Sequence, residues 1–190
     1  WILRFVLLVL LAVFSAVQVF ASMGGMPFEI ASKITGPRQA ALGGTGVALQ
    51  GDYSSVSWNP ALLDNINESE LAAVHEFLFD DVFYDSLSFV YPAGRNGGFG
   101  ISAGYINYGS VEVTGQEGEA EGTENYSDII ISAGYGRALF YGVKGGITLK
   151  TVNKIMGNVS YTGFNADIGF FRTAGEIADF GIMARNILPL

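Results

Sequence analysis

The sequence predicts an all-β protein, an antiparallel transmembrane β-barrel with a small N-terminal helical plug. Three observations predict this class. Glycine is abundant, with 26 in 190 residues, and 49% of residues are hydrophobic. Several stretches alternate large apolar residues with small ones, the period of a strand. Beyond the first residues, no apolar run is long enough for a membrane helix, so any membrane crossing would use strands.

The first residues, WILRFVLLVLLAVFSAVQVFAS, predict a secretory signal peptide over residues 1–21. Arg4 precedes an apolar run at 5–20, and Val19 and Ala21 suit the −3 and −1 positions of a cleavage site. The alternative is a transmembrane anchor, but polar residues interrupt a run that is already short for a span. Export is therefore expected.

Residues 67–190 are predicted to form seven strands. In GGFGISAGYINYG, Phe99 and Ile101 share one face while Gly100 and Ser102 share the other. The same division recurs in DIIISAGYGR, YGVKGGITLKT and YTGFNADIGFF, around 87–91 and 180–184, and more weakly at Glu70–Phe79. A soluble sandwich is the alternative, yet its solvent face would carry many charges. Faces of glycine, serine and threonine favour a barrel lumen.

Loop lengths give a topology, because outer-membrane barrels alternate short periplasmic turns with longer external loops. Short turns are expected after Pro92, Ala138 and Ala174, and the acidic stretch at 110–127 is expected to be a long external loop. Seven strands cannot close an even-numbered barrel. Either an eighth strand lies at 46–50, or the chain is the first part of a larger barrel, which the missing initial Met favours.

Residues 22–66 are predicted to be a periplasmic segment and plug. Asn59 suits a helix N-cap and Pro60 the first helical position, so NPALLD is expected to form a short helical turn. Upstream, GPRQAALGGTGVAL predicts a small-residue helix broken by glycines. Such a segment is either an inert cap or a plug that gates a ligand path.

Together, GPRQAALGGTGVAL, SWNPALL and the strand region that follows resemble the PorV/PorQ-type outer-membrane proteins, relatives of the FadL long-chain fatty-acid channels. The resemblance runs from about residue 36 to the end. It implies a barrel of about fourteen strands with an N-terminal plug, this chain being the first half, and it matches Asn59, Pro60 and Ala61 to the plug motif. Relatives include hydrophobic-compound channels and a carrier in type IX secretion.

Other functional classes find little support. The net charge of −8 argues against nucleic-acid binding, and the absence of cysteine removes thiol chemistry. His75, the only histidine, has no nucleophile at a readable spacing, and the GGTG turn lacks a phosphate-loop lysine. Asp80, Asp81 and Asp85 lack the ligand order of a calcium loop. We therefore predict no catalytic residue, no metal and no cofactor.

Four charged residues fall on or near the lumen register: Lys144, Lys150, Asp167 and Arg185. They either pair with one another or hold a carboxylate headgroup. The neighbouring Thr148 is expected to accept a lysine in a wide lumen. The expected function is an outer-membrane barrel, in contact with membrane lipid, that passes or carries hydrophobic molecules such as fatty acids. The alternative is a non-conducting barrel that docks a secreted protein through its external loops.

Overall fold

The computed structural model describes residues 29–33, 36–49, 51–114, 119–176 and 178–188. The predicted signal peptide lies outside these residues. Among them, no helix combines the length and the apolar character needed to cross a lipid bilayer.

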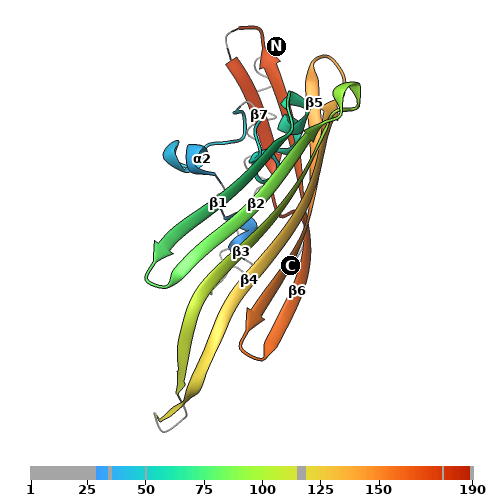
Figure 1. The fold of residues 1–190 in the computed structure, drawn as a ribbon. Coiled ribbons are helices and arrows are strands. Elements are labelled where there is room, and N and C mark those ends of the chain that lie inside the picture. Colours follow the sequence, from blue (N-terminus) through green and yellow to red (C-terminus); the bar gives the residue numbers. More distant parts are fainter. Residues whose placement is uncertain (1–28, 34–35, 50, 115–118, 177, 189–190) are drawn as a thin grey trace, which may run out of the picture.

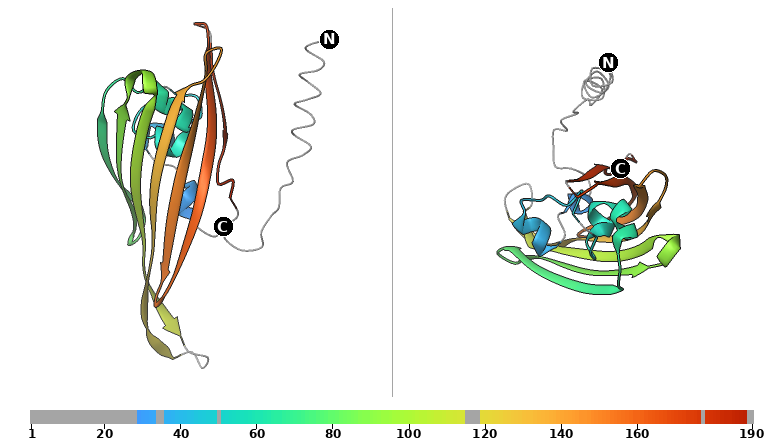
Figure 2. Two further views of the ribbon diagram at one scale, coloured as in Figure 1. Left: turned by 90° about the vertical axis from the view of Figure 1, so that its right-hand side faces the viewer. Right: turned by 90° about the horizontal axis from the view of Figure 1, so that it is seen from above.

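Seven strands form one antiparallel sheet in which each strand pairs with the next along the chain (Figure 1). Their bounds are β1 Glu70–Phe79, β2 Val82–Pro92, β3 Gly98–Thr114, β4 Ala120–Ala138, β5 Val143–Met156, β6 Val159–Ala174 and β7 Ala178–Ala184. The sheet curls into a half-barrel (Figure 2). The predicted all-β class and its seven strands are confirmed.

The two faces of the sheet carry the residues that the alternation assigned to them. Large apolar side chains point outward, and Ile101 and Leu149 are each 59% exposed. The opposite, concave face holds buried small or polar residues such as Ser88, Ser132 and Thr148. The outer face of the half-barrel is therefore apolar, whereas the exposed face of a sheet in a soluble protein is polar.

Short helices occupy the concave side of the sheet, as the view from above shows (Figure 2). They are η1 Glu29–Ser32, α2 Pro37–Ala41, α3 Ser55–Trp58 and η2 Pro60–Asn65, and a further turn, η3 Gly94–Asn96, joins β2 to β3. We call residues 29–66 the plug segment. Its buried side chains form small clusters with inward-facing residues of the strands, so the core lies between plug and wall.

Two expectations about the connections are wrong. The acidic stretch at 110–127 is not a long loop, because β3 continues to Thr114 and β4 starts at Ala120. Its valines and threonines favour extended backbone. In addition, the described residues at 46–49 contain a turn and a bend and no strand. The eighth strand that was considered at 46–50 is therefore absent from them.

Candidate functional site

A row of glycines on the concave face forms the seat of the plug segment. The strand register places Gly98, Gly136, Gly146 and Gly169 side by side across β3, β4, β5 and β6. A Cβ on any of them would overlap η2 or its cap: the main chain of Pro60 and Leu63, or the side chain of Asn59. The absence of side chains along this row lets the backbone of η2 lie directly on the strands.

Asn59 holds this contact together. Its Oδ1 accepts a hydrogen bond from the Ala61 N–H at 3.1 Å, so the predicted N-cap is confirmed. Its Nδ2 donates to the Val47 carbonyl at 2.7 Å and to the Phe170 carbonyl of β6 at 3.1 Å. One fully buried amide therefore caps η2 and ties it both to the preceding segment and to the barrel wall.

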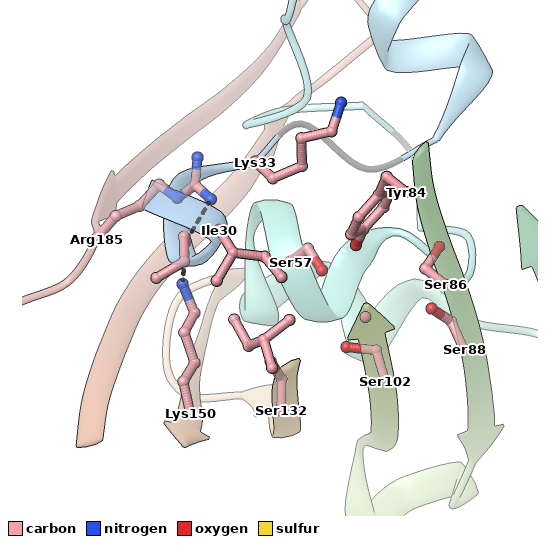
Figure 3. A pocket seen from close by; sticks show the side chains of 13 residues that line it. Ile30, Lys33, Ser57, Tyr84, Ser86, Ser88, Ser102, Ser132, Lys150 and Arg185 are labelled. Carbon is pink, nitrogen blue, oxygen red and sulfur yellow. Dashed lines mark hydrogen bonds between the residues drawn. The ribbon is translucent and has the colours of Figure 1, made fainter. Parts of the chain in front are cut away.

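Three of the four predicted lumen residues meet at the plug. Lys150 Nζ lies 2.5 Å from Asp167 Oδ2, with 2% and 0% of the two side chains exposed. Lys150 also donates to the Ala31 carbonyl of η1 at 3.2 Å, and Arg185 donates to the same carbonyl at 3.3 Å (Figure 3). The other carboxylate oxygen of Asp167, Oδ1, accepts a hydrogen bond from the Asn186 N–H at 2.8 Å. The cluster pairs Lys150 with Asp167, and its two cations fix η1 to the wall through the Ala31 carbonyl.

The backbone turns irregularly just after β7, and this brings Asn186 into contact with Lys150 and Asp167. Asn186 has φ 52°, in the left-handed region, and the Ile187 N–H then resumes pairing with the Ala166 carbonyl at 3.0 Å. Arg185 lies 5.7 Å from the Trp58 ring, within the range of a cation–π contact. The alternation predicted an inward Arg185, but no pattern in the sequence indicates that Asn186 joins it.

Lys144 stands apart from the other three. Its Nζ lies 2.8 Å from Asp64 Oδ2 at the end of η2 and also contacts the Asn65 side chain. Lys144 therefore fastens the far end of the same helix. All four predicted residues contact the plug segment or support the residues that do.

The predicted tolerance for a lysine at Thr148 is wrong. Thr148 is 0% exposed, and its Oγ1 donates to the Val56 carbonyl of α3 at 2.9 Å. The expectation assumed an open lumen at this level, whereas α3 fills it.

A row of serines runs parallel to the glycine row, separated from it by the inward row that contains Gly100, Gly134 and Thr148, and was not singled out from the sequence. The register brings Ser88, Ser102 and Ser132 into line with Lys150 across β2 to β5. With Arg185 and residues of η1 they enclose a polar cavity of about 20 Å³ (Figure 3). That volume suits about one water molecule. The alternation in the sequence contains the signal, but only the register shows that the serines align.

A larger, apolar cavity lies on the other side of η1, toward the β1–β2 turn. It has a volume of about 570 Å³, and its walls include Ile30, Leu78, Val82, Ile106 and Tyr108. Lys33 stands at its rim and forms an ion pair with Glu76 at 2.9 Å. Ligand pockets are typically 300–1,000 Å³ and mostly apolar, with a few polar groups. This cavity can therefore accept a hydrophobic molecule.

Hydrogen bonds hold the middle of the plug segment together and join it to β1. Gln39 Nε2 donates to Ser54 Oγ at 2.5 Å, and the Tyr53 N–H donates to Glu70 Oε2 at 3.0 Å. Burial, with smaller contributions from the carboxylates of Asp52 and Glu70, raises the pKa of the Tyr53 phenol. The neutral phenol is thus the form that fits this site.

The other singled-out groups lie outside the lumen. His75 is on the outer face of β1, with Nδ1 2.5 Å from Asp85 Oδ1 of β2. Asp80 and Asp81 form the β1–β2 turn, and both are exposed.

A family model described as the uncharacterised protein family UPF0164 matches residues 15–185. The chain belongs to UPF0164. The match takes in the whole plug segment and all seven strands, so the glycine seat and both cavities lie within the family region. No curated protein matches the chain.

Proposed function

We propose that this UPF0164 protein is an outer-membrane β-barrel that binds hydrophobic small molecules in its lumen and passes or carries them across the membrane. The observation that carries the proposal is the apolar cavity of about 570 Å³ between η1 and the inner wall. Fatty acids have suitable chemistry, because the walls are apolar, and their carboxylate would compete with Glu76 for Lys33 at the rim.

The outer face supports membrane placement. Across β1 to β5 the register aligns Leu71, Phe89, Ile101, Ala133 and Leu149 in one outward row. Their side chains are apolar and four of the five are large and exposed, which suits lipid and would be unfavourable in water.

Aromatic side chains edge this apolar surface near the short turns. Tyr91, Phe99 and Tyr135 follow one another across β2, β3 and β4 in the next outward row. Aromatic girdles are typical of barrel–membrane interfaces. The short-turn end is accordingly proposed to be periplasmic.

The resemblance to PorV/PorQ and FadL proteins, with a closed barrel of about fourteen strands, belongs to this proposal. The outer edges of β1 and β7 have no strand partner among the described residues. Closure of the barrel would satisfy both edges.

Passing a molecule through the lumen and carrying it in the apolar cavity make different demands on the plug segment. The glycine seat, Asn59 and the Lys150–Asp167 pair hold it against the wall, so passage through the lumen requires these contacts to open. Holding a molecule in the apolar cavity requires no such movement.

The alternative function is a non-conducting barrel that docks a secreted protein. It is favoured by the end of the β3–β4 hairpin, which projects beyond the neighbouring strands (Figure 1). Strands of 17 and 19 residues exceed the 9–11 residues that a membrane strand needs.

Uptake of labelled long-chain fatty acid by cells with and without the gene tests the proposal. Faster uptake with the gene is expected. Equal uptake, together with loss of a secreted protein from the surface of cells without the gene, would favour the alternative.

A further inference from the structure

The projecting end of the β3–β4 hairpin has two free edges. We call residues 110–114 of β3 and 120–125 of β4 the ribbon. The last pair between β2 and β3 is Phe83 with Asn107, and the last between β4 and β5 is Tyr126 with Met156. Beyond these pairs, neither edge of the ribbon has a strand partner within the described residues.

A bulge at the base of the ribbon marks where it leaves the wall. The register shifts between Asn107 and Ser110, and Gly109 there has φ 78°. The Gly109 N–H donates to the Asn107 side-chain oxygen at 2.6 Å. Such bulges bend and twist a strand pair, so the ribbon leaves the barrel wall at an angle to the strands below it.

Free strand edges are usually protected by lysine, proline or a covering segment, because they template pairing with another chain. The ribbon contains no lysine, arginine or proline, whereas it has glutamate at 112, 121 and 124, and Glu119 directly precedes its β4 part. Glu112 and Glu119 are exposed, and Asp80 and Asp81 of the neighbouring turn add to the acidic field. An edge with this charge excludes acidic strands and attracts basic ones.

A groove runs along the β4 side of the ribbon. It has a volume of about 510 Å³ and is lined by Val113, Thr123, Glu124, Asn125 and Asn158, among others. The Gly157 N–H donates to the Asn125 carbonyl at 3.2 Å, which closes the groove at its base. The groove therefore presents both a free strand edge and the Glu124 carboxylate to a partner.

We propose that the ribbon binds an extended, lysine- or arginine-bearing segment of a protein partner, which adds as a strand along the β4 edge and sets basic side chains on the face that carries Glu124. Main-chain hydrogen bonds supply affinity in this mode, and the side chains supply selectivity. A second copy of this chain fits less well, because it would bring the same acidic ribbon.

This inference deepens the docking alternative, and its biological meaning rests on the proposed external placement of this end of the barrel. Binding itself does not depend on conduction. The test therefore uses purified full-length protein in detergent micelles, where peptide binding and fatty-acid binding are measured on the same sample.

The probe is a short fluorescein-labelled peptide that alternates lysine and valine, measured by fluorescence anisotropy. Two control peptides replace lysine by glutamate, or keep lysine but carry N-methyl groups on alternate backbone amides. The basic peptide should bind at least about tenfold more tightly than either control, because one control lacks the charge and the other the hydrogen bonds.

The matched protein variants are Glu112→Lys/Glu124→Lys in the ribbon and Glu68→Lys/Glu176→Lys at the opposite end, which change the net charge equally. The ribbon variant should weaken peptide binding about tenfold at low salt, with fatty-acid binding unchanged. The other variant should bind as wild type. Equal binding of the N-methylated peptide, or equal weakening in both variants, would show non-specific charge attraction and overturn the proposal.

Discussion

Adding one methyl group to the glycine seat should weaken the plug. In Gly146→Ala the new Cβ would overlap the carbonyl of Pro60 and the amide of Ala61. These are main-chain atoms of η2, so no rotamer change relieves the overlap and the helix must move. Gly145→Ala is the matched control, because its Cβ points to the outer face and meets Cδ1 of the flexible Leu139 side chain.

The expected magnitudes separate the two variants. Overpacking a tightly packed site costs about 1–3 kcal/mol. Replacing a strand glycine by alanine recovers roughly 0.5–1 kcal/mol at either position, because the unfolded chain has less freedom to lose. Gly145→Ala should thus be neutral or slightly stabilising, and Gly146→Ala should lie about 1–3 kcal/mol below it in free energy of unfolding.

Urea unfolding of both variants, refolded in detergent micelles, measures this difference. Limited proteolysis of the native proteins adds a local readout, since a displaced η2 exposes the plug segment while the strands stay protected. Equal free energies of unfolding and equal cleavage in the two variants would refute the close approach of η2 to the glycine row.

Three further predictions concern the outer face, the cap and the plug phenol. Ile147→Lys should cost about 2–4 kcal/mol of unfolding free energy in a bilayer if it lies near the midplane, and Thr162→Lys near the edge only about 0–1; equal costs would contradict the lipid face. Asn59→Ala removes the η2 cap, worth about 1 kcal/mol, and the link to Phe170. It should therefore raise the frequency of open events in planar bilayers and leave the heat-modifiable gel mobility unchanged. Unchanged conductance and uptake would make the segment an inert cap. Because the pKa of Tyr53 is raised, folding favours its neutral form. The stability of the plug segment should therefore fall as pH rises from the normal tyrosine pKa, about 10, through the folded value. Tyr53→Phe should lessen that fall in pH-dependent proteolysis, and an identical fall in the variant would contradict the reasoning.

The sequence carried the strand assignments because their period of two was strong and glycine marked the inner face. Phe99 and Ile101 point outward and Gly100 points inward, as the alternation predicted. The helical turn after Asn59 was also readable, because an Asn-Pro pair constrains the local backbone whatever surrounds it.

Features that depend on alignment between strands were not readable. The glycine row requires the register of four strands, and a change of one residue would turn each of these glycines to the other face. The bond from Asn59 to Phe170 joins residues 111 positions apart, with no local signal. The projecting ribbon was mistaken for a loop because its glycines and glutamates resemble loop composition.

Titration of the purified protein with a fluorescent long-chain fatty acid tests the central claim that the apolar cavity holds a hydrophobic molecule. Val82→Trp fills the cavity from its wall, whereas Phe83→Trp places the same side chain on the outer face of the same strand. We expect wild type and Phe83→Trp to bind alike and Val82→Trp to lose at least about tenfold in affinity. Equal binding by all three proteins would contradict the claim.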